Sequence, residues 1–449
     1  MRKNIQFFLM YVQVFLNKFV SKIITGILIG FILTLFLVQI YPLYVKFFGK
    51  KEVKIGLVGK FTEKSLPLSI QNQISLGLTA LTSSGEATPS LAVSWSIDDK
   101  MTTYTFKLID NIYWSDNKIF SASDVNYILS GASFKVIDNH TLQVVLKEPY
   151  APLPVILSQP LIRPKLIGLG FYKASNINYN GDQIDKLTLL PSDNKYPIVT
   201  YKFYPNNNEA ILAFKLGEID KLQNVNDIQD LRNWRNIKIT EISLYDRIVL
   251  VIFNLQNQYF KEKEVRQAIT YAIPKFSNFD KALSPISPQS WAYSKSIRLY
   301  NNDLEAAEKI LGENPISSQS SELVLSTYSS NLSTAQMLVN SWNQVGLHTK
   351  VKVERSFPEN FDLFLTVLPI PPDPDQYPYW QSTQTNTNLS HYSNQKIDKL
   401  LEDGRKTIDL ESRKKIYADF QKYLVDDAPV IFLYYPKVFN IERKYVSAK

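Results

Sequence analysis

The segment PSLAVSWSIDDKMTTYTFKLIDNIYWSDNKIFSASDV, residues 89–125, places strand, turn and helix-start signals in close succession. Thr, Tyr and Phe are enriched in TYTFKLI (103–109), which is typical of a strand. YWSDNKIF (113–120) resembles a hairpin whose turn is formed by Asp116 and Asn117, two residues that tolerate turn conformations. The segment therefore predicts β-structure interrupted by tight turns.

A helix is expected directly after this hairpin. Ser121 and Asp124 have the S-x-x-D spacing of a capping box, and the helix would continue through Leu129. Trp114 lies between the hairpin turn and the helix start. A single tryptophan in such a position usually packs into a core, so we interpret it as a packing anchor and not as a ligand contact.

Length and composition indicate a folded protein of more than one domain. The chain has 449 residues, which exceeds one ordinary hydrophobic core, so two or three domains are expected. Hydrophobic residues make up 45% and aromatic residues 13% of the chain, which argues against disorder. There is no cysteine, which excludes disulfides, thiolate metal sites and cysteine nucleophiles.

The net charge of +8 belongs to the N-terminal end. Residues 1–60 contain nine Lys and Arg residues and one acid, Glu52, which leaves 41 of the 50 basic and 41 of the 42 acidic residues to 61–449. The body of the protein is therefore neutral. This distribution removes the main argument for nucleic-acid binding.

Residues 23–45 form an uncharged run that is long enough to cross a bilayer. At about 1.5 Å per residue this helix would reach roughly 34 Å, against a hydrocarbon core of about 30 Å. We predict a single-pass anchor in the cell membrane, followed by a basic juxtamembrane tether over 46–60. Residues 1–22 would be cytoplasmic, where they can form an interfacial helix, and the C-terminal part would lie outside the cytoplasm. Charge alone does not decide the orientation.

The second half of the chain alternates strand and helix patterns. LVLST (323–327) has strand character, and apolar residues then recur at helical spacing over 335–345 until Gly346. Further strand or helix patterns are LHTKVKV (347–353), FDLFLTVL (361–368), IVLVIFN (248–254) and EVRQAITYAI (264–273). Such a repeat predicts an α/β domain with parallel strand pairing.

Six segments of the chain resemble, in order, the solute-binding proteins of peptide and nickel ABC importers, family 5 of these proteins. The first is the 89–125 segment, which is similar to the family's "P-x-LA-x-SW … YTF-x-L … W-x-DG … TA-x-DV" pattern. The others are GEID (217–220), IFNLQNQYFKEKEVRQAITYAI (252–273), AEKIL (307–311), AQMLVNSWNQVGLHTKV (335–351) and HYSNQKIDKLLEDGRKTIDLESRKKIYADFQKYLVDDAPVIFLYY (391–435).

This resemblance implies an α/β, two-lobed periplasmic-binding-protein-like fold with an extra third domain. Domain I would be a discontinuous lobe of residues 53–80, 172–246 and 428–449. Domain II would be 81–171, packed against domain I, and domain III, the second lobe, would be 247–427. The segment around Trp114 would then lie in domain II, away from the solute.

The function that the resemblance implies is capture of peptides or peptide-like solutes in the cleft between the lobes, for delivery to an ABC permease. The chain would be a monomer without a cofactor. An enzyme is not expected, because His140, His348 and His391 are isolated and no paired metal-ligand spacing occurs. The alternative is a ligand sensor or a surface interaction protein on the same scaffold, without a role in transport.

The candidate solute-binding loop is LPIPPDPDQYPYW (368–380). In peptide-binding relatives an aspartate of a "W-x-x-D-x-x-DP" stretch pairs with the amino terminus of the peptide. Alignment of Pro374 with the family's DP places Asp373 on the second aspartate and Ile370 on the amine-pairing one. Asp373 or Asp375 is therefore our candidate for the amine, and the alternative is that both simply belong to a polar turn.

Aromatic residues complete the candidate ligand-binding set. QYPYW contributes Tyr377 and Trp380, and VIFLYY (430–435) contributes Phe432 and Tyr434 near the expected hinge. Large flat side chains line many ligand clefts. An apolar run such as VIFLYY is also what a buried strand looks like, and both interpretations stay open.

Overall fold

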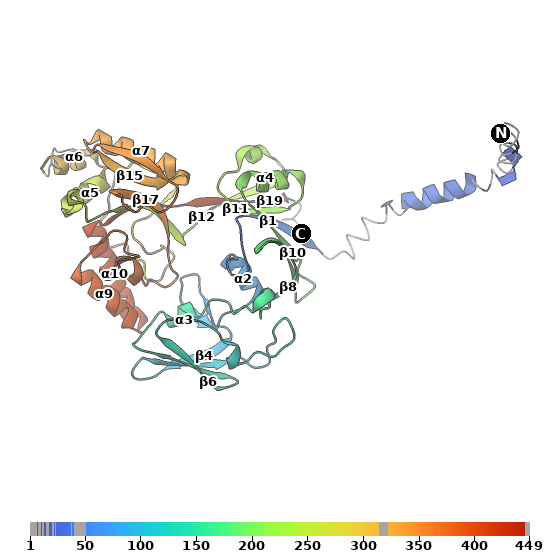
Figure 1. The fold of residues 1–449 in the computed structure, drawn as a ribbon, viewed down its shortest axis with the longest axis horizontal. Helices are drawn as coiled ribbons and strands as arrows, with labels where there is room; N and C mark the ends of the chain where they lie inside the picture. The colour runs from blue at the N-terminus through green and yellow to red at the C-terminus, as the bar shows by residue number, and fades with distance from the viewer. Residues whose placement is uncertain are drawn as a thin grey trace.

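The structure, a computed structural model, describes residues 51–313 and 322–444, residues 24–36 and several isolated positions before residue 51. Two large β-sheets carry helices, and a smaller four-stranded sheet lies beside them (Figure 1). The predicted α/β class is therefore confirmed.

The seven-stranded sheet and its helices form what we name the first lobe. Its strands, in sheet order, are β12 (Ile237–Ser243), β19 (Lys437–Arg443), β11 (Lys221–Val225), β1 (Glu52–Val58), β10 (Ile198–Tyr204), β9 (Gln183–Pro191) and β8 (Tyr172–Asn180), with helices α2 (Leu68–Ile74) and α4 (Asn207–Leu216). Ile55 and Leu57 of β1 are buried in this sheet. The prediction of a basic tether over 46–60 is wrong for residues 52–58, because Glu52–Val58 form a central strand of this sheet.

The six-stranded sheet and its helices form the second lobe. Its strands, in sheet order, are β14 (Asp280–Lys281), β18 (Val430–Tyr435), β13 (Arg247–Phe253), β17 (Leu363–Pro369), β15 (Leu323–Tyr328) and β16 (Thr349–Glu354). Its helices are α5 (Lys263–Tyr271), α6 (Leu304–Glu313), α7 (Leu332–Gln344), α8 (Tyr377–Trp380), α9 (Gln395–Lys406) and α10 (Leu410–Asp427). β15 is parallel to β16 and β17, as the strand-helix-strand repeat predicts.

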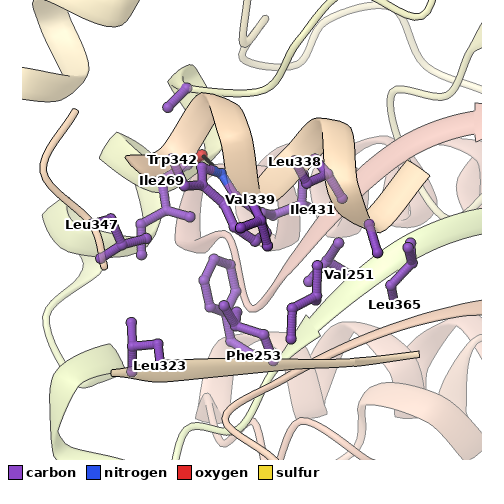
Figure 2. Packing of buried hydrophobic residues seen from close by; sticks show 14 of the residues in the cluster. Val251, Phe253, Ile269, Leu323, Leu338, Val339, Trp342, Leu347, Leu365 and Ile431 are labelled. Carbon is purple, nitrogen blue, oxygen red and sulfur yellow. Dashed lines mark hydrogen bonds between the residues drawn. The ribbon is translucent and has the colours of Figure 1, made fainter. Parts of the chain in front are cut away.

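Alternation along β13 explains why helices cover both faces of this sheet. Val249, Val251 and Phe253 point into a core with α5 and α7, whereas Ile248 and Leu250 face α9 and α10 on the other side. The first of these cores includes the fully buried Trp342 of α7 and is drawn in Figure 2.

The smaller unit, which we name the four-stranded domain, lies between residues 79 and 169. Its elements are β4 (Ala92–Ile97), β5 (Thr103–Leu108), β7 (Thr141–Leu146), β6 (Ala132–Asp138), the ribbon β2 (Thr79–Leu81) with β3 (Ala87–Pro89), and α3 (Leu153–Ile156). Trp114 is 2% exposed in its core, and the ring lies 4.1 Å from the Arg163 guanidinium. Its Nε1 donates to Asp124 Oδ2 at 3.2 Å. Trp114 is a packing anchor, as predicted.

Two short segments connect the lobes. Residues 244–246 join β12 to β13, and Pro436 joins β18 to β19. The two segments are paired, since the Leu244 N–H donates to Pro436 O at 2.8 Å. The predicted domain I boundary at residue 428 differs from this pairing, because β18 pairs with β13 and β14 of the second lobe. All six residues of β18 are buried there, which the apolar run VIFLYY explains.

The predicted helix after the hairpin is wrong. Only one 3-10 turn forms, η1 (Ala122–Asp124), although the Ser121 N–H donates to Asp124 Oδ2 at 2.9 Å as in a capping box. The chain then leaves the helix because the Tyr127 hydroxyl lies 2.6 Å from Gln159 O and ties it to a neighbouring segment. Val125, Tyr127 and Leu129 pack against the core of the domain, whereas Ile128 between them is fully exposed. Burial at alternate positions is typical of an extended chain and not of a helix.

The hairpin turn depends on Asn117, which is exposed and has a left-handed backbone with φ of 67°. Replacing it by Ala is expected to lower the free energy of unfolding by about 1 kcal/mol, because Ala tolerates this conformation poorly. Asn117→Gly is expected to stay within about 0.5 kcal/mol of the unsubstituted chain, since glycine adopts it freely. Urea unfolding followed by tryptophan fluorescence checks both values. Equal losses for the two variants would contradict this account of the turn.

Among the described residues, none of the helices combines the length and the apolar character needed to cross a membrane. Of the predicted anchor at 23–45, only residues 24–36, 38 and 39 are described, and residues 40–50 lie outside the described part. Most of the predicted cytoplasmic segment 1–22 also lies outside it.

Candidate functional site

The carboxyl ends of five strands meet at the junction of the two lobes. Two of the strands are parallel neighbours in the sheet of the second lobe, and three are parallel neighbours in the sheet of the first lobe. Pro369 pairs with Arg247, the first residue of β13, so β17 and its parallel neighbour β15 end beside the crossing. Val225 pairs with Phe439 near the start of β19, so β11 and its parallel neighbour β1 end at the same junction, as does β10. Ligands of α/β proteins bind outside such carboxyl ends. The loops that follow these strands form our candidate site.

The loop after β17 is fixed to the crossing at its first residue. The Ile370 N–H donates to Asp246 O at 2.7 Å, and the Ile370 side chain is packed into the core that α9 and α10 cover. This residue occupies the position that the resemblance gives to an amine-pairing aspartate. It therefore serves the packing of the second lobe.

Asp373 is held by an arginine of α10. Arg413 Nη2 lies 2.8 Å from Asp373 Oδ1, and Arg413 Nη1 lies 3.1 Å from Oδ2, so the pair is bidentate. Both side chains are only 6% exposed. Arg413 Nε also donates to Gly404 O at 2.8 Å, which joins α9 and α10 to the loop. Asp373 is thus a buried carboxylate whose charge is already compensated.

Asp375 is paired with a different arginine, Arg405, which is more accessible than Arg413. Arg405 Nε lies 3.0 Å from Asp375 Oδ1 and 2.9 Å from Oδ2, and the two side chains are 27% and 9% exposed, respectively. The Arg405 guanidinium lies 4.0 Å from the Tyr377 ring. Burial raises the pKa of Asp375, and Arg405 offsets part of that shift. Both candidate carboxylates therefore have a cation as partner without any solute.

The four-stranded domain contacts this same loop. The Tyr150 hydroxyl lies 3.5 Å from Asp375 Oδ2, and the Ala151 N–H donates to Arg405 O at 2.7 Å. Gly85 approaches from the β2–β3 ribbon with φ of 89°, and a Cβ on it would lie 2.6 Å from Pro372 O. Sequence reasoning missed this contact. The sequence offers one signal for this contact, the glycine of SSGEAT (83–88), but a glycine is equally expected in an ordinary polar turn.

The six candidate residues are not brought together in one place. Asp373, Asp375, Tyr377 and Trp380 share the loop after β17 and the short helix α8. Trp380 is 4% exposed and its Nε1 donates to Gln376 Oε1 at 3.0 Å, whereas Tyr377 is only partly buried.

Phe432 and Tyr434 lie on β18, which is separated from β17 by β13. Tyr434 packs in the core against Phe279 at 4.2 Å between ring centroids, and its hydroxyl is 2.7 Å from Thr334 Oγ1. Phe432 lines a cavity of about 560 Å³ at the β14 edge of the sheet, together with Phe276 and Tyr300. Both β18 aromatics are thus buried in the second lobe, and Phe432 also borders this cavity.

A sequence model described as "Bacterial extracellular solute-binding proteins, family 5 Middle" matches residues 86–389. The chain belongs to this family. The family 5 resemblance found in the six motifs is therefore confirmed. As a family 5 solute-binding protein of the peptide and nickel ABC transporters, the chain acts outside the cytoplasm.

Relatives of this family 5 protein are named for several solutes. It is 28% identical to the oligopeptide-binding protein AppA of Bacillus subtilis over 53% of this chain and 50% of that one. It is 24% identical to the dipeptide-binding protein of Escherichia coli over 81% of this chain and 83% of that one. The structure of NikZ from Campylobacter jejuni in complex with Ni(L-His) has a TM-score of 0.71 at 24% identity, over 88% of this chain and 94% of that one.

Proposed function

We propose that this family 5 protein captures a peptide or peptide-like solute between its two lobes and delivers it to the permease of an ABC importer. The observation that carries the proposal is the convergence of five strand ends at a junction that, within the described part of the chain, two short segments cross. Two lobes joined in this way can close around a solute and exclude water from it.

Asp375 is the better candidate of the two carboxylates for the amino group of the solute. Asp373 is held from both oxygens by Arg413, and both side chains are buried. Arg405, in contrast, is 27% exposed and donates to both Asp375 oxygens from Nε, so its guanidinium can be displaced at lower cost than the buried one of Arg413. Tyr377, which is only partly buried, would supply flat apolar surface beside this carboxylate, and the buried Trp380 would support the loop from within.

A thermal-shift screen of the full chain tests the proposal, with mixed dipeptides and tripeptides, free amino acids and nickel–histidine as probes. A solute at a hundred times its dissociation constant stabilises the folded state by about 2.7 kcal/mol. We expect a peptide-induced shift that Asp375→Asn abolishes when each variant is compared with its own midpoint. Asp403→Asn, on the exposed pair with Lys399 of α9, is the matched control and should keep the shift.

The absence of a shift with every probe would contradict solute capture. It would favour the alternative function, a sensor or surface interaction protein on the same scaffold. The observation behind this alternative is that Asp373 and Asp375 are both paired with arginines in the protein itself.

The proposal includes a single-pass anchor at residues 23–45, for which the uncharged run is the support. Leu33→Arg combined with Leu35→Arg is expected to release the chain from membranes washed with carbonate, because each arginine at the centre of a spanning helix costs about 2.5–3.5 kcal/mol. Leu216→Arg, at an exposed residue of α4, is the control and should stay membrane-bound. Retention of the double variant would refute the anchor.

A further inference from the structure

An exposed aromatic corner lies at the end of the first lobe that is opposite the lobe junction. Phe171 is 42% and Tyr196 55% exposed, and their ring centroids are 4.8 Å apart in an edge-to-face arrangement. Tyr172 joins the corner through Phe171 at 5.3 Å. Exposed rings that gather in this way are candidates for an interaction surface, because isolated exposed apolar residues need no partner but a cluster costs free energy in water.

This corner adjoins the point at which the chain enters the first lobe. The Ile198 N–H donates to Lys51 O at 2.7 Å, and Glu52 is the register partner of Ile198, two residues after Tyr196. Because β1 and β10 are parallel, this is their amino end, and the lobe junction lies at their carboxyl end. Figure 1 shows β1 entering at the end of the first lobe that is remote from the second lobe.

Lysines surround the aromatic corner. Lys51, Lys173 and Lys195 are exposed and flank Phe171 and Tyr196 in the sequence or in the sheet. Asp193 is the acid of the same loop, and its carboxylate accepts the Lys195 N–H at 2.9 Å. Tyrosine rings and lysines together are the groups that proteins place at the headgroup level of a bilayer, and lysines attract anionic lipids.

The length of the connecting chain sets how far this corner can be from a membrane. Only residues 46–51 separate the uncharged segment 23–45 from β1. Six extended residues span at most about 22 Å. If residues 23–45 cross the bilayer, the amino end of β1 therefore lies within this distance of the headgroups, and the aromatic corner beside it faces the same side of the lobe.

We infer that the corner formed by Phe171, Tyr172 and Tyr196, with Lys51, Lys173 and Lys195, docks on the surface of a bilayer containing anionic lipids. This inference rests on the anchor that is part of the proposed function. Docking holds the amino ends of β1 and β10 against the membrane.

The natural absence of cysteine makes a direct test possible. The full chain with Tyr196→Cys carries an environment-sensitive NBD label and is placed in nanodiscs that contain lipids with a spin-label quencher near the headgroup. We expect at least roughly twofold quenching at position 196, as for a group at the interface. The same label on Ser133→Cys, an exposed residue of β6, should stay unquenched. Lys195→Cys provides a second labelled position, should the first variant fold poorly.

The charged part of the surface is tested with the same label. Lys173→Gln combined with Lys51→Gln should lower the ratio of docked to undocked chains roughly tenfold or more in discs with anionic lipid. The matched control, Lys100→Gln with Lys135→Gln, removes two exposed lysines from the four-stranded domain and should have no effect.

Two failures can be told apart. A full chain that is not retained in nanodiscs at all would refute the anchor and this inference with it. A chain that is retained but shows the same fluorescence at position 196 as at position 133 would overturn the docking alone, and the anchor would stand.

Discussion

Asp373→Asn is expected to lower the free energy of unfolding by about 3–5 kcal/mol. The substitution removes the charge that compensates Arg413, and this guanidinium would then be buried without a counter-ion. Arg413 also holds Gly404 O, so the loss extends to the contact between α9 and α10. Urea unfolding of the full chain, followed by tryptophan fluorescence, measures the effect.

The matched control for this prediction is Asp403→Asn, which breaks an exposed pair and should change stability by less than about 1 kcal/mol. A double variant, Asp373→Asn with Arg413→Met, removes both charges and should recover a large part of the loss. If Asp373→Asn proves as mild as the control, Asp373 is not a structural carboxylate, and its role as an amine ligand gains support.

Trp342→Ala is expected to cost about 3–5 kcal/mol, because it leaves a cavity between α7, α5 and the sheet. Trp342 is fully buried and its Nε1 donates to Ile269 O at 3.1 Å, so the variant also loses a buried hydrogen bond (Figure 2). The control is Met337→Ala on the same helix, since Met337 is 41% exposed and should matter little. Similar midpoints for the two variants would show that this core is not what stabilises the second lobe.

Local sequence patterns predict those helices and strands whose buried residues recur at regular spacing within the element itself. The apolar period over 335–345 predicts a helix that the structure places at Leu332–Gln344. FDLFLTVL (361–368) predicts a buried strand, observed as Leu363–Pro369. In both, the side chains that face the core recur with the period of the element, so that one short window contains the whole signal.

The candidate site could be predicted only in part, because the negative charges of its carboxylates are compensated by arginines that are far away in the sequence. The loop 368–380 is found from its motif, but the pairs Asp373–Arg413 and Asp375–Arg405 join residues whose proximity no local pattern encodes. The lobe to which β18 belongs is likewise not encoded locally. Its apolar run fits the core of either lobe, and its pairing with β13 places it in the second. The missing helix after Ser121 shows the reverse error, because a correct capping signal is followed by apolar residues that are buried at alternate positions, as in an extended chain.

The position of β19 has a consequence for the order of folding. This strand, from nearly the end of the chain, lies between β11 and β12 and pairs with both. The first lobe therefore stays incomplete during synthesis, with two unpaired strand edges, until residues 437–443 have emerged. A ribosome or translocon that releases the chain slowly would keep these edges open to non-native pairing for that time, and a truncation after Pro436 would leave them open permanently.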